Sequence, residues 1–202
     1  MITPIHAGAA RKLAPADIAT AAKAIRCETA IVRAVLAVES RGSGFDDDRR
    51  PVILFEPHVL YRNLTGDELL HAIMLGVAYK KWGARPYPKT SDDNYARLEL
   101  ARKVNNERAF RAVSIGLGQI LGENFEAAGF KSAAAMFVSA CDSEGNQLAQ
   151  MVNFIKANRL DGYLRSRNWA GFAARYNGPG YARNNYDDKL ADAYRRAKLK
   201  GL

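Results

Sequence analysis

The sequence predicts a mostly α-helical (α+β) fold with one small β hairpin or extended lobe near residues 45–57. Apolar residues recur at helical spacing over most of the chain, and the best β-prone run is Val52–Phe55. The chain has 202 residues, of which 48% are hydrophobic, so one domain with a sizeable core is expected. Without an internal repeat, a low-complexity tract or a long linker, residues 1–202 are interpreted as a single domain.

The first two helices are predicted from apolar residues spaced i, i+3, i+4, i+7. Pro15 suits the first turn of the first helix, and Gly42 and Gly44 end the second. The apolar positions are Ile18, Ala21, Ala22 and Ile25, then Ile31, Ala34, Val35 and Val38. Glu39 therefore lies at the end of an apolar helix, beside a loop.

The remaining elements follow in order. Asp46–Pro51 is a polar turn that leads into the strand candidate, and Thr65–Glu68 has the spacing of a capping box. Lys80–Lys89 is a connection that contains Pro and Gly. Residues 116–122 form a tight segment with glycines at 116, 118 and 122. Helices are expected at 91–104, from 106, and at 132–140, 144–158, 169–176 and 186–200, with a break at Asn177–Gly180.

The net charge of +9 favours a polyanionic partner, namely nucleic acid, anionic lipid or an anionic cell wall. No predicted helix carries a dense basic face with interleaved aromatics, which disfavours nucleic acid. No apolar run reaches the length of a membrane span, and Met1–Leu13 does not read as a secretory signal.

Cysteine and histidine usage predicts neither a metal site nor a cofactor. Cys27 and Cys141 are interpreted as thiols of a reducing compartment, with a disulfide between them as the alternative. His6, His58 and His71 lack the spacing of metal ligands.

Glu39 is the first candidate catalytic residue. It shares part of a helix face with Val35 and Leu36, and an apolar site raises a carboxyl pKa until the group can act as a general acid. The alternative is a solvated glutamate paired with an arginine of the same segment. A negative charge at a helix C-terminus is mildly unfavourable, so stabilising its own helix does not explain the presence of Glu39.

Further carboxylates follow within a short stretch. Asp46, Asp47, Asp48 and Glu56 offer a second acidic group, as glycoside hydrolysis requires. Asp is also favoured in turns, so the three aspartates have a structural alternative. Glu56 follows the strand candidate and precedes His58, which either binds substrate or simply hydrogen-bonds Glu56.

Two downstream segments suit a saccharide. Ser114–Ile120 contains Gly116, where the backbone admits close approach, and the amide of Gln119. Tyr176 and Asn177 place an aromatic ring and an amide at a helix end. The structural alternatives are helix packing for the first segment, and a buried ring with a turn asparagine for the second.

These motifs, taken in order, resemble the lysozyme-like superfamily, in particular goose-type lysozymes and soluble lytic transglycosylases. The motifs are Glu39-Ser40 with the glycines that follow, Gly116-Leu117-Gly118-Gln119, and Ala174-Arg175-Tyr176-Asn177-Gly178-Pro179-Gly180. With Ile53–His58 added, the chain resembles the N-acetylmuramidase domain of bacteriophage endolysins over roughly residues 15–200.

The resemblance implies a lysozyme-like helical domain with Glu39 as catalytic acid and Ser114, Gln119, Tyr176 and Asn177 along the groove. The second carboxylate is expected at Glu56, then at Asp46, Asp47 or Asp48. The implied activity is hydrolysis of the β-1,4 bond between N-acetylmuramic acid and N-acetylglucosamine. A lytic transglycosylase, a non-catalytic wall-binding phage protein and a basic nucleic-acid binder are the alternatives.

The same resemblance implies a monomeric endolysin made in the host cytoplasm and released to the periplasm through a holin. We expect no separate cell-wall-binding module and no nucleic-acid partner. The basic final helix, Asp187–Lys200, suggests contact with anionic outer-membrane lipid, with packing on the core as the alternative.

Overall fold

The computed structural model describes residues 8–40, 42–178 and 184–200. Helices dominate, and three short strands form one sheet, so the expected mostly helical fold with a small β element is confirmed. The elements in chain order are α1 (Pro15–Ile25), α2 (Thr29–Glu39), β1 (Ile53–Phe55), α3 (Pro57–Asn63), α4 (Gly66–Met74), α5 (Ser91–Val104), α6 (Asn106–Arg111), β2 (Val113–Ile115), β3 (Ile120–Leu121), a 3₁₀ turn (Gly122–Asn124), α7 (Ala133–Asp142), α8 (Glu144–Ala157), α9 (Asp161–Arg165), α10 (Trp169–Tyr176) and α11 (Tyr186–Leu199).

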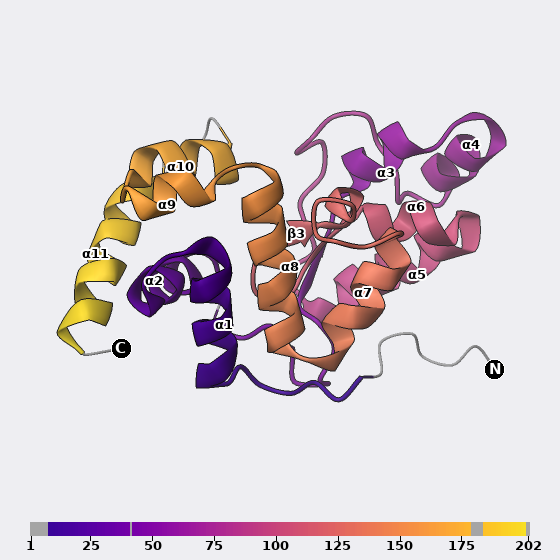
Figure 1. Cartoon of the computed structure of the whole chain (residues 1–202). Coiled ribbons are helices and arrows are strands. Elements are labelled where there is room, and N and C mark those ends of the chain that lie inside the picture. Colours follow the sequence, from indigo (N-terminus) through magenta and orange to yellow (C-terminus); the bar gives the residue numbers. More distant parts are fainter. Residues whose placement is uncertain (1–7, 41, 179–183, 201–202) are drawn as a thin grey trace.

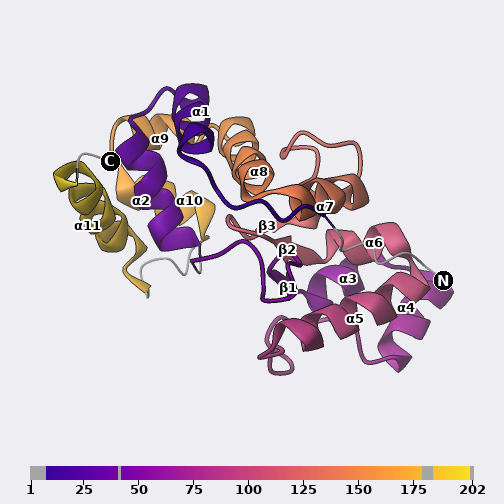
Figure 2. The same ribbon diagram turned by 90° about the horizontal axis from the view of Figure 1, so that it is seen from below.

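The sheet lies between two groups of helices. Figure 2 shows α1, α2 and α9–α11 on one side of the strands and α3–α6 on the other. Helix α8 runs between these groups and packs against α1, α7 and β3 (Figure 1). Helix α8 thus contacts both a helix of the first group and a strand of the sheet.

Helix α2 forms because its apolar residues recur at helical spacing and are buried on more than one side. Its partners are α1 and the last helix, α11, whose buried side chains are Leu190, Ala193 and Ala197. The apolar stripe of α11 therefore covers α2, as the packing interpretation of the final helix expected. Helix α2, whose last residue is Glu39, is therefore packed between α1 and α11.

The strand prediction at residues 52–55 is confirmed, but its partners lie far along the chain. The sheet order is β1-β2-β3, antiparallel throughout, with Leu54 opposite Ser114 and Ser114 opposite Leu121. Within residues 45–57, a bridge joins Phe45 to Pro51 across the aspartate turn. Strands of two and three residues are too short for a period-two pattern to show, which is why residues 113–121 did not read as β.

The local expectations need correction at α3, at α9 and at the start of α4. Helices α3 and α9 were not expected; at α3, Pro57 occupies the first turn and favours the helix start. Thr65 is the N-cap of α4 as predicted, but its side chain makes no capping hydrogen bond. The side chain of Thr90 caps α5 instead, accepting from the backbone N–H of Asp93 at 3.1 Å. The break expected at Asn177–Gly180 extends beyond the described residues.

Cys27 and Cys141 are thiols and form no disulfide. Within the described residues, no helix is long and apolar enough to cross a bilayer.

Candidate active site

Glu39 is the last residue of α2 and is half-buried there. Burial raises the pKa of its carboxyl, and a hydrogen bond from Asn177 opposes that rise without cancelling it. The bond runs from Nδ2 of Asn177 to Oε1 of Glu39 over 3.0 Å. Because Oε1 accepts this bond, the carboxyl proton belongs on Oε2, the oxygen that is left to donate.

Asn177 and Tyr176 reach Glu39 from the end of α10. The hydroxyl of Tyr176 donates to the carbonyl of Gly118 at 3.0 Å, and its ring stacks on Phe172 with centroids 5.1 Å apart. Burial, and then the charge of Glu39, raise the pKa of Tyr176 well above its usual value. The phenol therefore remains a neutral donor that joins α10 to the β2–β3 turn.

The β2–β3 turn contains the expected Gly116–Gln119 segment. Gly116 has φ +64° and Gln119 has φ +47°, so the turn uses the left-handed region twice. Nε2 of Gln119 donates to the carbonyls of Gly116 at 2.9 Å and Val52 at 3.3 Å. This amide thus ties the turn to the residue before β1, while Ser114 lies half-buried on β2 beside Leu54 and Leu121.

Helix α8 is hydrogen-bonded to both the loop that follows Glu39 and the β2–β3 turn. Gln147, almost fully buried, accepts from the backbone N–H of Leu117 at 2.9 Å and donates to the carbonyl of Gly44 at 3.2 Å. A Cβ at Gly116 would stand 2.5 Å from the side chain of Gln147, so this glycine is required by the close approach. One buried amide therefore joins the loop after Glu39 to the β2–β3 turn.

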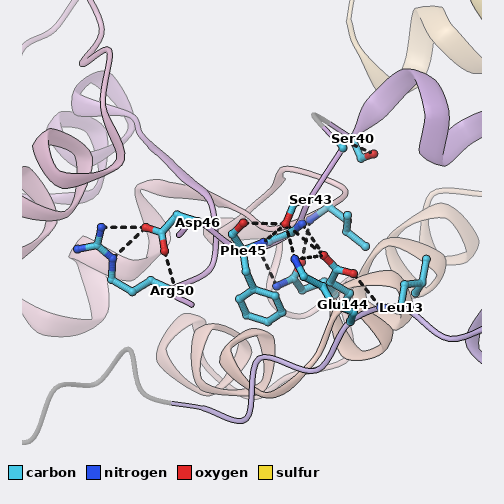
Figure 3. A network of polar contacts seen from close by, with 12 residues as sticks. Leu13, Ser40, Ser43, Phe45, Asp46, Arg50 and Glu144 are labelled. Carbon is cyan, nitrogen blue, oxygen red and sulfur yellow. Dashed lines mark hydrogen bonds and ion pairs between the residues drawn. The ribbon is translucent and has the colours of Figure 1, made fainter. Parts of the chain in front are cut away.

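Glu144 adds a second anchor one turn earlier on α8. Its carboxylate accepts 2.8 Å bonds from the backbone N–H groups of Gly44 and Leu13, with the ammonium of Lys12 at 3.4 Å. Figure 3 shows Glu144 between the Leu13 segment and the loop that carries Ser43. Burial opposes ionisation, but these backbone bonds outweigh it and hold the pKa of Glu144 below its usual value.

The aspartate run forms a turn that is tied to α5. Asp46 accepts bonds from Nε of Arg50 at 2.9 Å and from the hydroxyl of Ser91 at 2.5 Å. Burial would raise the pKa of Asp46, yet these hydrogen bonds and the charge of Arg50 lower it. Figure 3 shows the Asp46–Arg50 pair on the far side of Phe45 from Glu144.

Glu56 lies just after β1, at the other end of the strand from Val52. Its Oε2 accepts from the hydroxyl of Tyr87 at 2.5 Å and lies 3.4 Å from Nδ1 of His58. Glu56 is four residues further along the extended chain than Val52, a rise of about 13 Å. Because Val52 is the residue bonded to Gln119, Glu56 is displaced along the strand from the Gln119 contact.

Comparison with known proteins then identifies the family. The family model described as N-acetylmuramidase matches residues 28–198, most of the chain. The chain belongs to the N-acetylmuramidase family. The crystal structure of the Burkholderia AP3 phage endolysin is similar at 39% identity and a TM-score of 0.85, covering 94% of this chain and 73% of that one. A search of curated proteins finds no match.

In this N-acetylmuramidase, a hydrogen bond links the Glu39 motif to the Tyr176–Asn177 motif. Glu39 contacts Asn177, and the neighbouring Tyr176 contacts the Gly116–Gln119 turn. Glu56 and His58 contact each other instead, and Asp46 contacts Arg50. Among the described residues, no other carboxylate is hydrogen-bonded to Glu39, and no group of His, Cys, Asp or Glu is arranged to hold a metal ion.

Sequence reasoning missed two anchors of this candidate site, Glu144 and Gln147. Both are buried although polar, and they share one face of α8 with Met151. A polar residue recurring on the apolar face of a helix is the signal that would have found them, since buried polar groups require partners. Tyr87, the partner of Glu56, lies in a connection that showed no periodicity.

Proposed function

We propose that this chain hydrolyses the β-1,4 bond between N-acetylmuramic acid and N-acetylglucosamine in peptidoglycan, with Glu39 as general acid. The observation that supports this is the half-buried Glu39 carboxyl, whose pKa is raised by burial and whose Oε1 is held by Asn177. A raised pKa keeps a larger fraction of the carboxyl protonated near neutral pH, as a proton donor requires.

The chemistry follows from that proton. Oε2 of Glu39 protonates the glycosidic oxygen as its bond to the anomeric carbon breaks, and the sugar passes through an oxocarbenium-like state. A water molecule then adds to the anomeric carbon, and the proton that it releases is taken up by the Glu39 carboxylate, which regenerates the acid. Asn177 stabilises the Glu39 carboxylate that the first step leaves, because its N–H bond favours the charged form.

Substrate binding is proposed for Ser114, Gly116, Gln119, Tyr176, Asn177 and His58. Their support is unequal. Ser114 lies half-buried on the middle strand, whereas the hydroxyl of Tyr176 and the Nε2 of Gln119 already bond backbone carbonyls. We infer that Tyr176 and Gln119 shape the site, and that Ser114 is free to contact sugar.

The second carboxylate has weaker support. The Arg50 and Ser91 bonds give Asp46 a structural role, while Asp47 and Asp48 belong to the same turn. Glu56 is engaged by Tyr87 at the far end of β1. The proposal therefore rests on Glu39 and does not require a paired carboxylate.

A site that works without a paired carboxylate also suits a second candidate function, that of a lytic transglycosylase. In such a reaction, the C6 hydroxyl of the muramic sugar replaces water and yields a 1,6-anhydro product. The supporting observation is that, within the described residues, only Asn177 is hydrogen-bonded to the Glu39 carboxylate. The two reactions share the acid and differ in the nucleophile.

The similarity to a phage endolysin and the net charge of +9 support a wall-lysing role against an anionic envelope. We propose that the protein acts as a monomer on peptidoglycan in the periplasm, after release through a holin. Contact of α11 with anionic lipid would use its exposed lysines and arginines, since its apolar stripe is buried against α2.

The test compares the wild type with Glu39→Gln on purified peptidoglycan. Loss of general acid catalysis should lower the rate by about 10²–10⁴-fold. Glu126→Gln, at an exposed glutamate, is the matched control and should keep the wild-type rate. Lysis retained by Glu39→Gln would overturn the proposal, and inactive wild type would favour a non-catalytic wall-binding protein.

Mass spectrometry of the released muropeptides separates the two enzymatic candidates. A reducing muramic end supports hydrolysis. A product lighter by one water, with no reducing end, supports transglycosylation.

A further inference from the structure

The connection between α4 and α5, residues 75–90, is long and has no regular secondary structure. Long structureless loops in a compact domain are commonly functional. Figures 1 and 2 place this connection on the side of the α3–α6 group that faces α10. The connection therefore belongs to the α3–α6 group and lies across the strands from α2.

The loop is fixed at several points. Val77 and Ala78 are buried, and the guanidinium of Arg85 lies over the ring of Tyr79, 5.4 Å from its centroid. Near its far end, the hydroxyl of Tyr87 donates to Glu56 at 2.5 Å. A loop held in this way presents its tip in a defined place, which lowers the entropic cost of binding there.

The tip carries Trp82, whose surface is 73% exposed. A tryptophan is rarely left so exposed on a fixed loop, because its ring offers a large area that gains by leaving water. Its indole also contacts the phenol of Tyr87, opposing the rise in pKa that burial and Glu56 impose on that phenol. Trp82 thus stands next to the Tyr87–Glu56–His58 cluster.

The polar and charged groups around Trp82 indicate the ligand. Glu56 and His58 side chains are 14% and 22% exposed, so each offers an edge to a ligand, and Nε2 of His58 has no bond among the described residues. The loop adds four cations without an ion-pair partner in the described chain: Lys80, Lys81, Arg85 and Lys89. A flat apolar ring beside hydrogen-bonding groups suits a pyranose, and the cations suit carboxylates.

We propose that Trp82, Tyr87, His58 and Glu56, with the lysines of the same loop, form a binding subsite for an N-acetylated glycan that carries acidic peptide stems. The sugar face stacks on Trp82, His58 and the Glu56–Tyr87 pair bond its polar groups, and Lys80 and Lys81 attract the stem carboxylates. Glu56 is then a binding residue, displaced along β1 from the Gln119 contact. This inference rests on the proposed function, since it extends the same glycan along the strand.

Binding is tested in a Glu39→Gln, Trp169→Phe background, in which Trp82 is the only tryptophan. Two probes are compared: tetra-N-acetylchitotetraose, an uncharged glycan, and a muropeptide tetrasaccharide with its stems. Both should shift the Trp82 emission, and Trp82→Ala should weaken binding by roughly tenfold in calorimetry. Met74→Ala removes another highly exposed apolar side chain and should leave binding unchanged.

Charge is tested with the Lys80→Ala, Lys81→Ala double variant. It should weaken binding of the muropeptide and spare the chitotetraose, whereas Lys131→Ala should affect neither. A single-stranded oligonucleotide is the remaining probe, because aromatic and basic side chains together also suit single strands. Tighter binding of the oligonucleotide than of the muropeptide would overturn the glycan assignment.

Kinetics on the soluble muropeptide separate binding from chemistry. In the otherwise wild-type protein, Trp82→Ala and Glu56→Gln should raise KM while kcat stays within about twofold. A Glu56→Gln variant with kcat lost and KM unchanged would assign Glu56 to catalysis instead. If Trp82→Ala behaves like Met74→Ala while Glu39→Gln is inactive, the subsite fails and the proposed function stands; if Glu39→Gln is active, the proposed function fails.

Discussion

Asn177 donates a 3.0 Å hydrogen bond to the carboxylate of Glu39 across 138 residues of sequence. The bond joins the C-cap of α10 to the last residue of α2. It favours the charged carboxylate while burial favours the neutral acid, and burial has the larger effect. The balance between these two opposing effects sets the pH range in which Glu39 carries a proton.

Asn177→Ala should move the basic limb of the pH–activity profile to higher pH. Removing the donor takes away a stabilisation of the carboxylate, so the pKa of Glu39 rises further and the acid stays protonated longer. The maximal rate should fall, because the carboxyl loses its orienting bond. Asn158→Ala removes a comparable amide that bonds only its own helix, and its profile should match the wild type. A basic limb that moved downward in Asn177→Ala would contradict the assignment of Glu39 as the acid.

Glu39→Gln should be inactive and yet more stable than the wild type at neutral pH. Because folding raises the pKa of Glu39, the folded state holds the proton more tightly than the unfolded chain does. The stability due to this group is full below the unfolded pKa and is lost as pH rises through the folded one. Thermal melts should show a Tm advantage for Glu39→Gln that grows with pH above the ordinary glutamate pKa. Equal pH dependence in the two proteins would mean that Glu39 is solvated.

Sequence reasoning singled out Glu39 because the helix before it has a clear apolar period. It singled out Tyr176 and Asn177 because they place an aromatic ring and an amide at a helix end. It could not show that Asn177 contacts Glu39, since no local pattern encodes a contact between the two helix ends. It also missed β2 and β3, where two- and three-residue strands leave no periodicity and the sheet is defined by pairing with residues 53–55.

The polar residues were harder to assign than the apolar ones. The aspartate run fits both a catalytic cluster and a turn, and only its bonds to Arg50 and Ser91 reveal a structural role. Gln147 gives no signal unless its neighbours on α8 are known to be buried. The function of a polar side chain depends on partners that the fold brings from elsewhere, whereas an apolar period is a property of the segment itself.

Asp46→Asn should destabilise the protein by about 1–2 kcal/mol, through its charged bonds to Arg50 and Ser91. Its lowered pKa means that its contribution is present above the unfolded pKa and is lost as pH falls through the folded one. The wild type should therefore lose more stability than Asp46→Asn on acidification. Asp47→Asn, in the same turn, should retain stability and lysis. A kcat loss of orders of magnitude in Asp47→Asn or Asp48→Asn, with stability intact, would restore the aspartates as the second catalytic group.

Gln147→Leu should reduce both stability and activity, because one buried amide holds the loop after Glu39 and the β2–β3 turn. The substitution leaves the N–H of Leu117 and the carbonyl of Gly44 buried without that partner, at about 2–4 kcal/mol in total. Gln150→Leu is the matched control on the same helix: its amide is as buried but bonds Met136 in α7 rather than either site segment. Denaturant unfolding should show that both variants are destabilised, while kcat/KM per folded molecule falls only in Gln147→Leu. If the two variants lose activity in proportion to their stability alone, Gln147 supports the fold and does not position the site.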